Sequence, residues 1–237
     1  MSSVRLDVIS AGAAHSLVAA IAKEDAVEVA GTFGAVGAMR EKFLAGEACD
    51  LLILTKAQIA QLAAERRVDG ASAADLGVVR TAIAVRAGEA VPDVSDAVKL
   101  REAILAADAL YFPDPERATA GIHFVKVLDA LGIRAAVEPR FRNFPNGATS
   151  MRELARSTGH TLGCTQSTEI VATPGIALVA MLPPAFELAT VYTAAVSAAA
   201  RDAGNARAFI SRLVGAASLT ARRRAGFEGI PPASAPG

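Results

Sequence analysis

Three stretches of small residues each join an apolar strand to a helix, and together they are candidates for one shared anion site. They are Ala13–Leu17 (AAHSL), Phe33–Met39 (FGAVGAM) and Asp114–Gly121 (DPERATAG). The first backbone N–H groups of a helix have no partner inside the helix and carry partial positive charge. Several such turns at neighbouring strand ends would direct their amides at one small anion.

Two residues of the first stretch carry candidate chemistry. Ser16 stands at an expected helix start, where a serine hydroxyl is suited either to cap the helix or to contact a ligand. His15 is the candidate catalytic residue, because an imidazole titrates near neutral pH and the turn would present it to a ligand. A surface position for His15 is the alternative. His123 and His160 are expected to face solvent.

Arginine side chains are the candidate clamps for a carboxylate, because a guanidinium pairs with it through two hydrogen bonds and keeps its charge. Arg40 and Arg80 are the first candidates, and Arg117 is the third. The alternative for Arg40 is a solvent-facing position on its helix, next to Glu41 and Lys42.

Uncharged donors are expected from Thr119, Thr149 and Gln166. Thr149 is also a natural helix cap. Glu169 follows the strand that ends at Gln166, and it would act as a base if it were buried beside a ligand. A paired structural role is the alternative for Glu169.

Charge and composition exclude several classes of protein. The 237 residues include 24 basic and 24 acidic residues, so no overall field draws the chain to nucleic acid or to an anionic membrane. The one basic run, Arg222–Arg224, is interpreted as the solvated end of a terminal helix. The richest apolar run, Ile176–Met181, is too short to cross a bilayer, so we expect no membrane insertion.

The cysteines predict neither a metal site nor a redox pair. Cys49 and Cys164 lie far apart and form no CxxC or zinc-binding spacing. We therefore expect no metal and no cofactor. The N-terminus enters a strand pattern without the regions of a secretory signal, so the chain as written is expected in the cytoplasm, or in the periplasm if a native signal was removed.

Strand and helix patterns alternate along the first part of the chain, as in βαβ units. The expected strands are 5–10, 27–33 and 50–54, and the expected helices are 16–23, 37–45 and 57–65. Right-handed crossovers would place these strands in a parallel sheet with helices on its faces.

The same alternation begins again after a longer strand at 78–85. We expect helices at 121–131 and 149–156 and from Ser95, with strands at 109–112, 137–142 and 161–165. A second extended run, 189–197, returns to helices at 205–215 and 219–226. The expected fold is thus α/β, with two lobes joined by two extended strands: residues 1–84 with 193–237, and residues 85–192. Pro231–Gly237 has the composition of a disordered tail.

The order of these motifs resembles the type II periplasmic binding proteins, and in particular the molybdate-binding group. The resemblance runs from Val4 to Gly226 and includes AHSL at 14–17, FGAVG at 33–37, DLLI at 50–53, DP at 114–115 with AGI at 120–122, and GCTQSTEI at 163–170. It implies two mixed sheets flanked by helices, two hinge strands, and a ligand cleft between the lobes.

In the molybdate binders, two serine hydroxyls, backbone amides and a tyrosine hold the oxyanion. The resemblance assigns these roles to Ser16, Val36, Ala120, Thr149 and Gln166, with Ala35 beside Val36. Val36 has no hydroxyl and Gln166 replaces a phenol, so a tetrahedral dianion would lose donors here.

A further likeness is to the branch of this superfamily that includes aconitate isomerase. It is carried by RTAIAVRAG at 80–88, TQSTEI at 165–170, and PGI at 174–176 with LPP at 182–184 and TVY at 190–192. It implies an organic di- or tricarboxylate ligand. Two functions stay open: a binding protein that closes on a small anion, with an ABC permease as partner only if exported, and an isomerase that moves an allylic proton.

Overall fold

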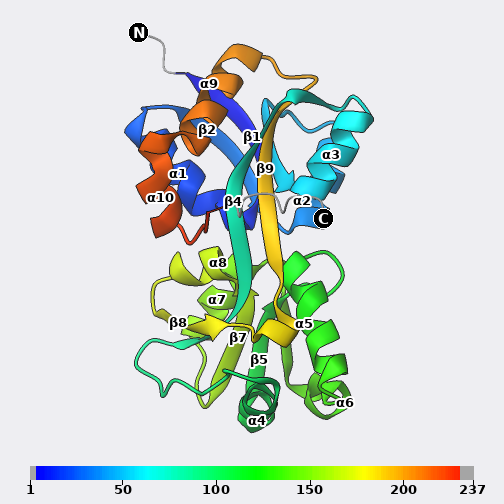
Figure 1. Ribbon diagram of the computed structural model, residues 1–237, viewed down its shortest axis with the longest axis vertical. Helices are drawn as coiled ribbons and strands as arrows, with labels where there is room; N and C mark the ends of the chain where they lie inside the picture. The colour runs from blue at the N-terminus through cyan, green and yellow to red at the C-terminus, as the bar shows by residue number, and fades with distance from the viewer. Residues whose placement is uncertain (1–3, 230–237) are drawn as a thin grey trace, which may run out of the picture.

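A computed structural model describes residues 4–229, and Figure 1 shows two α/β lobes stacked along its longest axis. Two long strands, β4 (Val68–Arg86) and β9 (Ala189–Ser197), run from one lobe into the other. They pair antiparallel, from Val68 opposite Ser197 to Arg80 opposite Ala189. The expected two-lobe α/β fold with two extended connecting strands is therefore confirmed.

Lobe 1 contains both ends of the described chain. Its strand order is β2-β1-β3-β9-β4, in which β1 is parallel to β2 and β3 while β9 is antiparallel to both of its neighbours. The remaining strands are β1 (Arg5–Ala11), β2 (Glu28–Gly34) and β3 (Leu51–Thr55), and the helices are α1 (His15–Glu24), α2 (Val36–Leu44), α3 (Lys56–Ala64), α9 (Ala203–Val214) and α10 (Leu219–Arg224).

Lobe 2 repeats this arrangement with β4 as the shared strand. Its order is β4-β7-β5-β6 with β8 on the other side of β4, and β5 is parallel to β6 and β7. The strands are β5 (Ala109–Pro113), β6 (Phe141–Phe144), β7 (Thr161–Gln166) and β8 (Ile176–Met181), and the helices are α4 (Ala97–Ala106), α5 (Thr119–Ala130), α6 (Arg134–Val137), α7 (Gly147–Ala155) and α8 (Ser167–Val171).

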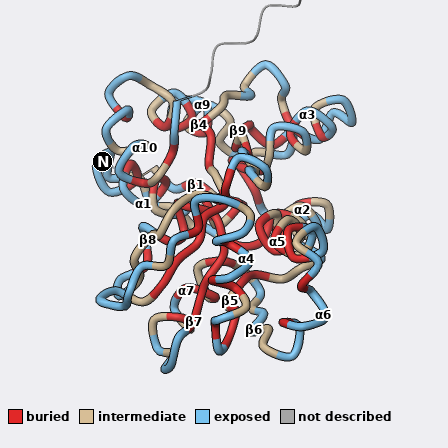
Figure 2. The backbone as a smooth tube through the Cα atoms, turned by 60° about the horizontal axis from the view of Figure 1, so that its bottom comes forward, coloured by how far each residue is buried: buried red, intermediate tan, exposed pale blue. Residues whose placement is uncertain are grey.

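Each lobe has its own hydrophobic core. Leu52, Ile53 and Leu17 are fully buried in lobe 1, and Phe112 and Leu128 are fully buried in lobe 2. Figure 2 shows the buried backbone concentrated in the central strands. The two cores meet along β4, where Val79 belongs to the first and Ile83 to the second. The expected borders at 84/85 and 192/193 fall inside β4 and β9, which continue through them.

One expected strand is wrong. Residues 137–142 were expected to be extended, but the chain forms α6 and a 3-10 turn, Glu138–Arg140, before β6 begins at Phe141. The Arg140 guanidinium holds this turn, because it donates hydrogen bonds to the carbonyls of Leu105 and Ala107 at the end of α4. Tertiary contacts thus override the local β-rich pattern.

The structure adds two further details. No described helix is long and apolar enough to cross a membrane, and the tail at 231–237 lies outside the described residues.

Candidate functional site

A small cavity lies where the two lobes meet beside β9. Its volume is about 20 Å³, room for about one water molecule. Its lining comes from strand ends and helix starts of both lobes: Ala11, Gly12, Ala13, Gly34, Ala35, Val36, Pro113, Ala118, Thr119, Ala120, Gly147, Thr165, Gln166, Glu169 and Tyr192. The lobes are closed over it, because the Gly37 N–H donates to the Arg117 carbonyl across the cleft at 3.1 Å.

Two of the helices that begin at this cavity, α2 and α5, are not capped by side chains. Ala35 precedes α2 and Ala118 precedes α5, and neither alanine can accept from the first-turn amides. Helices α3, α4, α7 and α9 instead begin with a side chain that accepts a backbone N–H: Thr55, Asp96, Asn146 and Asp202. The Gly37 amide already donates to the Arg117 carbonyl, and the remaining first-turn amides of α2 and α5 are available to a ligand.

Gly121 allows α5 to begin this close to its strand. A Cβ there would overlap the carbonyl oxygens of Pro113 and Asp114. With no side chain at Gly121, the helix start sits directly on the end of β5, and Thr119 and Ala120 line the cavity.

The charge in the cavity lining is a carboxyl group. Glu169 is 8% exposed, and its Oε2 accepts a hydrogen bond from the Thr165 hydroxyl at 2.6 Å. Burial raises the pKa of Glu169, while that hydrogen bond and the backbone amides of Ala148, Gln166 and Gly147 oppose the rise. Among the described residues, no Lys or Arg lines the cavity to neutralise this carboxyl.

A phenol and an amide complete the polar wall. Gln166 Nε2 donates to the Tyr192 hydroxyl at 3.2 Å, and Gln166 Oε1 is buried with no hydrogen-bond partner in the described structure. Burial raises the pKa of Tyr192, and the nearby Glu169 carboxylate raises it further. The phenol therefore stays protonated at neutral pH and can donate to a ligand.

Five of the sequence-predicted ligand residues meet at this cavity: Ala35, Val36, Thr119, Ala120 and Gln166. They come from α2, α5 and the end of β7, so both lobes contribute. Their roles in binding stay predictions, but their common location is what the strand-to-helix pattern requires.

The structure places the expected catalytic residue and its neighbour elsewhere. The chain passes the cavity at Ala11–Ala13 and then makes a 3-10 turn, Gly12–Ala14, so α1 starts beyond it. His15 is exposed and packs against Phe33, with ring centroids 4.4 Å apart. His15 and Ser16 line a pocket at the surface that also touches Glu169.

The remaining candidates do not line the cavity. Arg80 forms ion pairs with Glu187 and Glu228, so its charge is already balanced. Thr149 lies inside α7, where its amide donates to the Asn146 side chain; the helix cap is therefore Asn146 and not Thr149, and Thr149 does not line the cavity. Arg40 lies on α2 one turn beyond Val36 and does not line the cavity.

The sequence reasoning did not assign Tyr192, Thr165 or Gly147 to the site. A phenol was expected to be missing because Gln166 takes its place, yet Tyr192 brings one to the same cavity from β9. A usable signal exists: Tyr192 is one of two tyrosines in the chain and stands in a strand expected to link the lobes. Glu169 is buried at the cavity and is also hydrogen-bonded by Thr165 and three backbone amides, so its two expected roles, a base and a paired structural group, both stay predictions.

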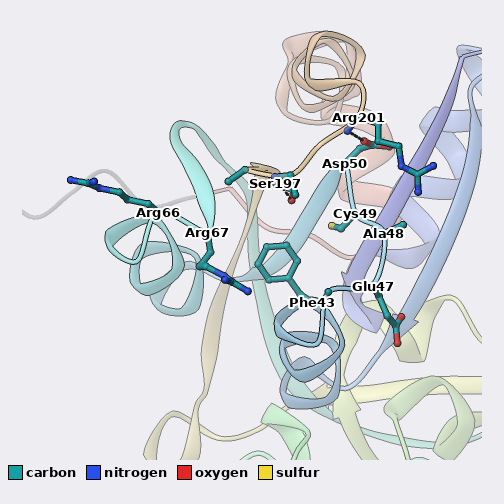
Figure 3. Close-up of a pocket in the computed structure, with 12 residues that line it drawn as sticks. Phe43, Glu47, Ala48, Cys49, Asp50, Arg66, Arg67, Ser197 and Arg201 are labelled. Atoms are coloured by element: carbon teal, nitrogen blue, oxygen red, sulfur yellow. Dashed lines mark hydrogen bonds between the residues drawn. The ribbon is translucent and has the colours of Figure 1, made fainter.

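A larger pocket lies at the far end of lobe 1, with a volume of about 510 Å³ (Figure 3). Its charged side chains do not converge on one point. Arg66 projects away from the pocket on one side, and Arg201 lies on the other side of the pocket. The Asp50 carboxylate there is satisfied by the backbone amides of Asp7, Arg201 and Asp202. These features favour the cavity between the lobes as the ligand site.

Comparisons with known proteins agree with this geometry. The structure resembles the periplasmic molybdate-binding protein of Azotobacter vinelandii (TM-score 0.76, 17% identity, 96% of this chain and 100% of that one). It also resembles the sulfate-binding protein SubI of Mycobacterium tuberculosis (TM-score 0.73, 17% identity, 97% and 88%). An aconitate isomerase from Pseudomonas sp is 24% identical over 198 residues, 82% of this chain and 72% of the relative. Residues 8–228 match the family of bacterial extracellular solute-binding proteins, to which this chain belongs.

Proposed function

We propose that the protein binds a small anion in the cavity between its lobes, and that this anion is an organic di- or tricarboxylate. The observation that carries the proposal is the pair of helices, α2 and α5, that start at the cavity with alanine in the capping position. The Tyr192 phenol, which stays protonated at the same cavity, is a further donor for an anion.

Several features favour a carboxylate over molybdate or sulfate. The molybdate- and sulfate-binding structures share the fold at 17% identity, whereas the aconitate isomerase is similar in sequence at 24% identity. Alanine and valine at positions 35 and 36 offer no hydroxyl. Because the closed cavity is only about 20 Å³, the groups that line it must rearrange around a tricarboxylate. Delivery to an ABC permease is the role we propose for an exported form.

The first experiment is a thermal-shift panel of molybdate, tungstate, sulfate, aconitate, citrate and tricarballylate. A ligand at about 100 times its Kd adds about 2.7 kcal/mol to the free energy of unfolding, so a true ligand raises Tm clearly. We expect the carboxylates to raise Tm. A rise with molybdate alone would overturn the carboxylate assignment, and no rise with any anion would overturn the binding function.

Proline substitutions test the role of the helix starts directly. Val36 and Thr119 are the first residues of α2 and α5, where proline is well tolerated but removes the N–H. The preceding residues are already extended, with ψ of 139° and 128°, as proline requires. A lost hydrogen bond to a charged ligand costs about 1.5–3 kcal/mol, so we expect Kd to rise about 10- to 150-fold.

The matched control is Ala97→Pro, at the first position of α4. It makes the same change at a helix start that carries its own cap, Asp96, and that does not line the cavity. Ligand affinity should be unchanged. Equal losses in all three variants would mean that the helix starts at the cavity have no special role.

A second candidate function is isomerisation of an unsaturated carboxylate. It is favoured by Glu169, a buried carboxyl that lines the cavity beside Tyr192 and is placed to take up and return a proton. The test is exchange of aconitate protons in deuterated water, followed by NMR. Loss of exchange in Glu169→Gln with exchange retained in His15→Ala supports Glu169 as the base, and the reverse supports His15. No exchange by the unmodified protein excludes the isomerase.

A further inference from the structure

The inference concerns the charge balance of the closed cavity, and it rests on the proposed anion-binding function. The cavity already contains the Glu169 carboxyl, and the described lining offers no Lys or Arg to balance it. A bound anion would bring a second negative charge into a space of about 20 Å³. A like charge this close, with no cation between the two, disfavours the ionised form of each group.

The position of Glu169 makes this conflict unavoidable when the lobes close. Its Oε2 lies in lobe 2, against Thr165 and the start of α7. Its Oε1 faces lobe 1, where a Cβ on Gly12 would lie 2.8 Å away. Gly12 of lobe 1 and the Glu169 carboxyl of lobe 2 therefore face each other at the cavity that the ligand shares.

The groups around Glu169 offer hydrogen bonds but little opposing charge. They are the Thr165 hydroxyl and the backbone amides of Gly147, Ala148 and Gln166, and the Tyr192 phenol lies nearby. Two charged or titratable groups, His15 and Arg152, lie in the neighbouring surface pocket that Glu169 also lines. That pocket, about 180 Å³ in volume, gives the carboxyl a path to water.

We propose that the protein binds its anion together with one proton, which the Glu169 carboxyl shares with an oxygen of the ligand. Glu169 then acts as a donor to the anion rather than as a repelling charge. The raised pKa of Glu169 in the ligand-free protein agrees with this role. A ligand that carries its own hydroxyl proton can supply the shared proton itself. A fully ionised ligand cannot, so in that case the proton comes from solvent.

The test is the pH dependence of affinity, measured by calorimetry with sulfate and with trans-aconitate between about pH 7 and 9, where both probes are fully ionised. On the alkaline side of the Glu169 pKa we expect Kd to rise towards tenfold per pH unit. Repeating the titration in buffers with different ionisation enthalpies should show uptake of about one proton per bound anion. Affinity independent of pH, with no proton uptake, would overturn the proposal.

The variant Glu169→Gln keeps the shape of the side chain and removes its charge. It should bind the same anions with an affinity that no longer depends on pH and is at least as tight as that of the unmodified protein at pH 9. Glu102→Gln, an exposed carboxylate on α4, is the matched control and should keep the pH dependence. If the affinity of Glu169→Gln for the anion still depended on pH as in the unmodified protein, the assignment of the proton to this residue would be refuted.

The outcomes separate this inference from the proposed function. If neither probe and no anion of the thermal-shift panel binds, the proposed function fails. If anions bind but carry no proton with them, only the inference fails. If Glu169→Gln does not fold, as judged by circular dichroism, the proton count of the unmodified protein still decides the matter.

Discussion

Gly12 is the point of lobe 1 that lies closest to the Glu169 carboxyl, so Gly12→Ala should separate ligand binding from stability. The added Cβ would lie 2.8 Å from Glu169 Oε1 and 3.6 Å from the Gly34 carbonyl oxygen. The first distance is about 0.5 Å shorter than an ordinary carbon–oxygen contact. The new methyl also enters a cavity of about 20 Å³.

This overlap exists only when the lobes are closed. Overpacking of this kind costs about 1–3 kcal/mol, and an open protein avoids it by keeping the lobes apart. We therefore expect the Kd for the best-binding anion of the thermal-shift panel to rise about 5- to 150-fold. The free energy of unfolding without ligand should change by less than about 0.5 kcal/mol.

Isothermal titration calorimetry measures the affinity, and urea unfolding measures the stability. Gly204→Ala is the matched control, because its Cβ would meet only Asp202 Oδ1, at an ordinary 3.8 Å. It should bind as the unmodified protein does. An unchanged Kd in Gly12→Ala would refute the reasoning, since the ligand would then not require this closed contact.

Three further predictions concern stability and reactivity. The pKa of Glu169 is higher in the folded protein than in the unfolded chain, so at pH values between the two pKa values the folded protein holds one more proton. The free energy of unfolding should therefore fall as the pH rises from the unfolded pKa to the folded pKa. Urea unfolding at several pH values should show a smaller fall for Glu169→Gln. Burial raises the pKa of the Cys49 thiol to about 12 and also that of Cys164, so a thiol reagent at about pH 8 should label neither cysteine until denaturant is added; rapid labelling of the folded protein would contradict their burial. Phe112, fully buried in lobe 2, should cost about 3–5 kcal/mol when replaced by alanine, measured by urea unfolding, and a loss below about 1 kcal/mol would mean that its neighbours are not packed as described.

Local sequence patterns were sufficient for most of the fold. Apolar strands followed by small residues and amphipathic helices predict the βαβ units, and strand 189–197 agrees with β9 at both ends. The failure at 137–142 has a tertiary cause, because Arg140 reaches across to the carbonyls that end α4. The extension of β4 back to Val68 was also missed, since residues 70–75 contain glycine, alanine and aspartate rather than β-branched residues.

The site was only partly predictable. The pattern of small residues predicted helix starts at Gly37 and Gly121, and α2 and α5 begin one and two residues earlier, at Val36 and Thr119, which line the cavity. The positions of His15 and Ser16 depend on the three-residue 3-10 turn Gly12–Ala14, which the hydrophobic periodicity of the sequence does not predict. The approach of Tyr192 to Gln166 depends on the antiparallel pairing of β9 with β4, a contact between residues far apart in the chain.

The path of the chain sets an order for folding during synthesis. Every strand and helix of lobe 2 has been made by the time Leu182 is added, whereas lobe 1 still lacks β9, which lies between β3 and β4 in its sheet. When residues 1–182 have left the ribosome, lobe 2 can therefore form its core, whereas the sheet of lobe 1 still has a gap where β9 belongs. Lobe 1 and the ligand cavity, which needs Tyr192, are completed last.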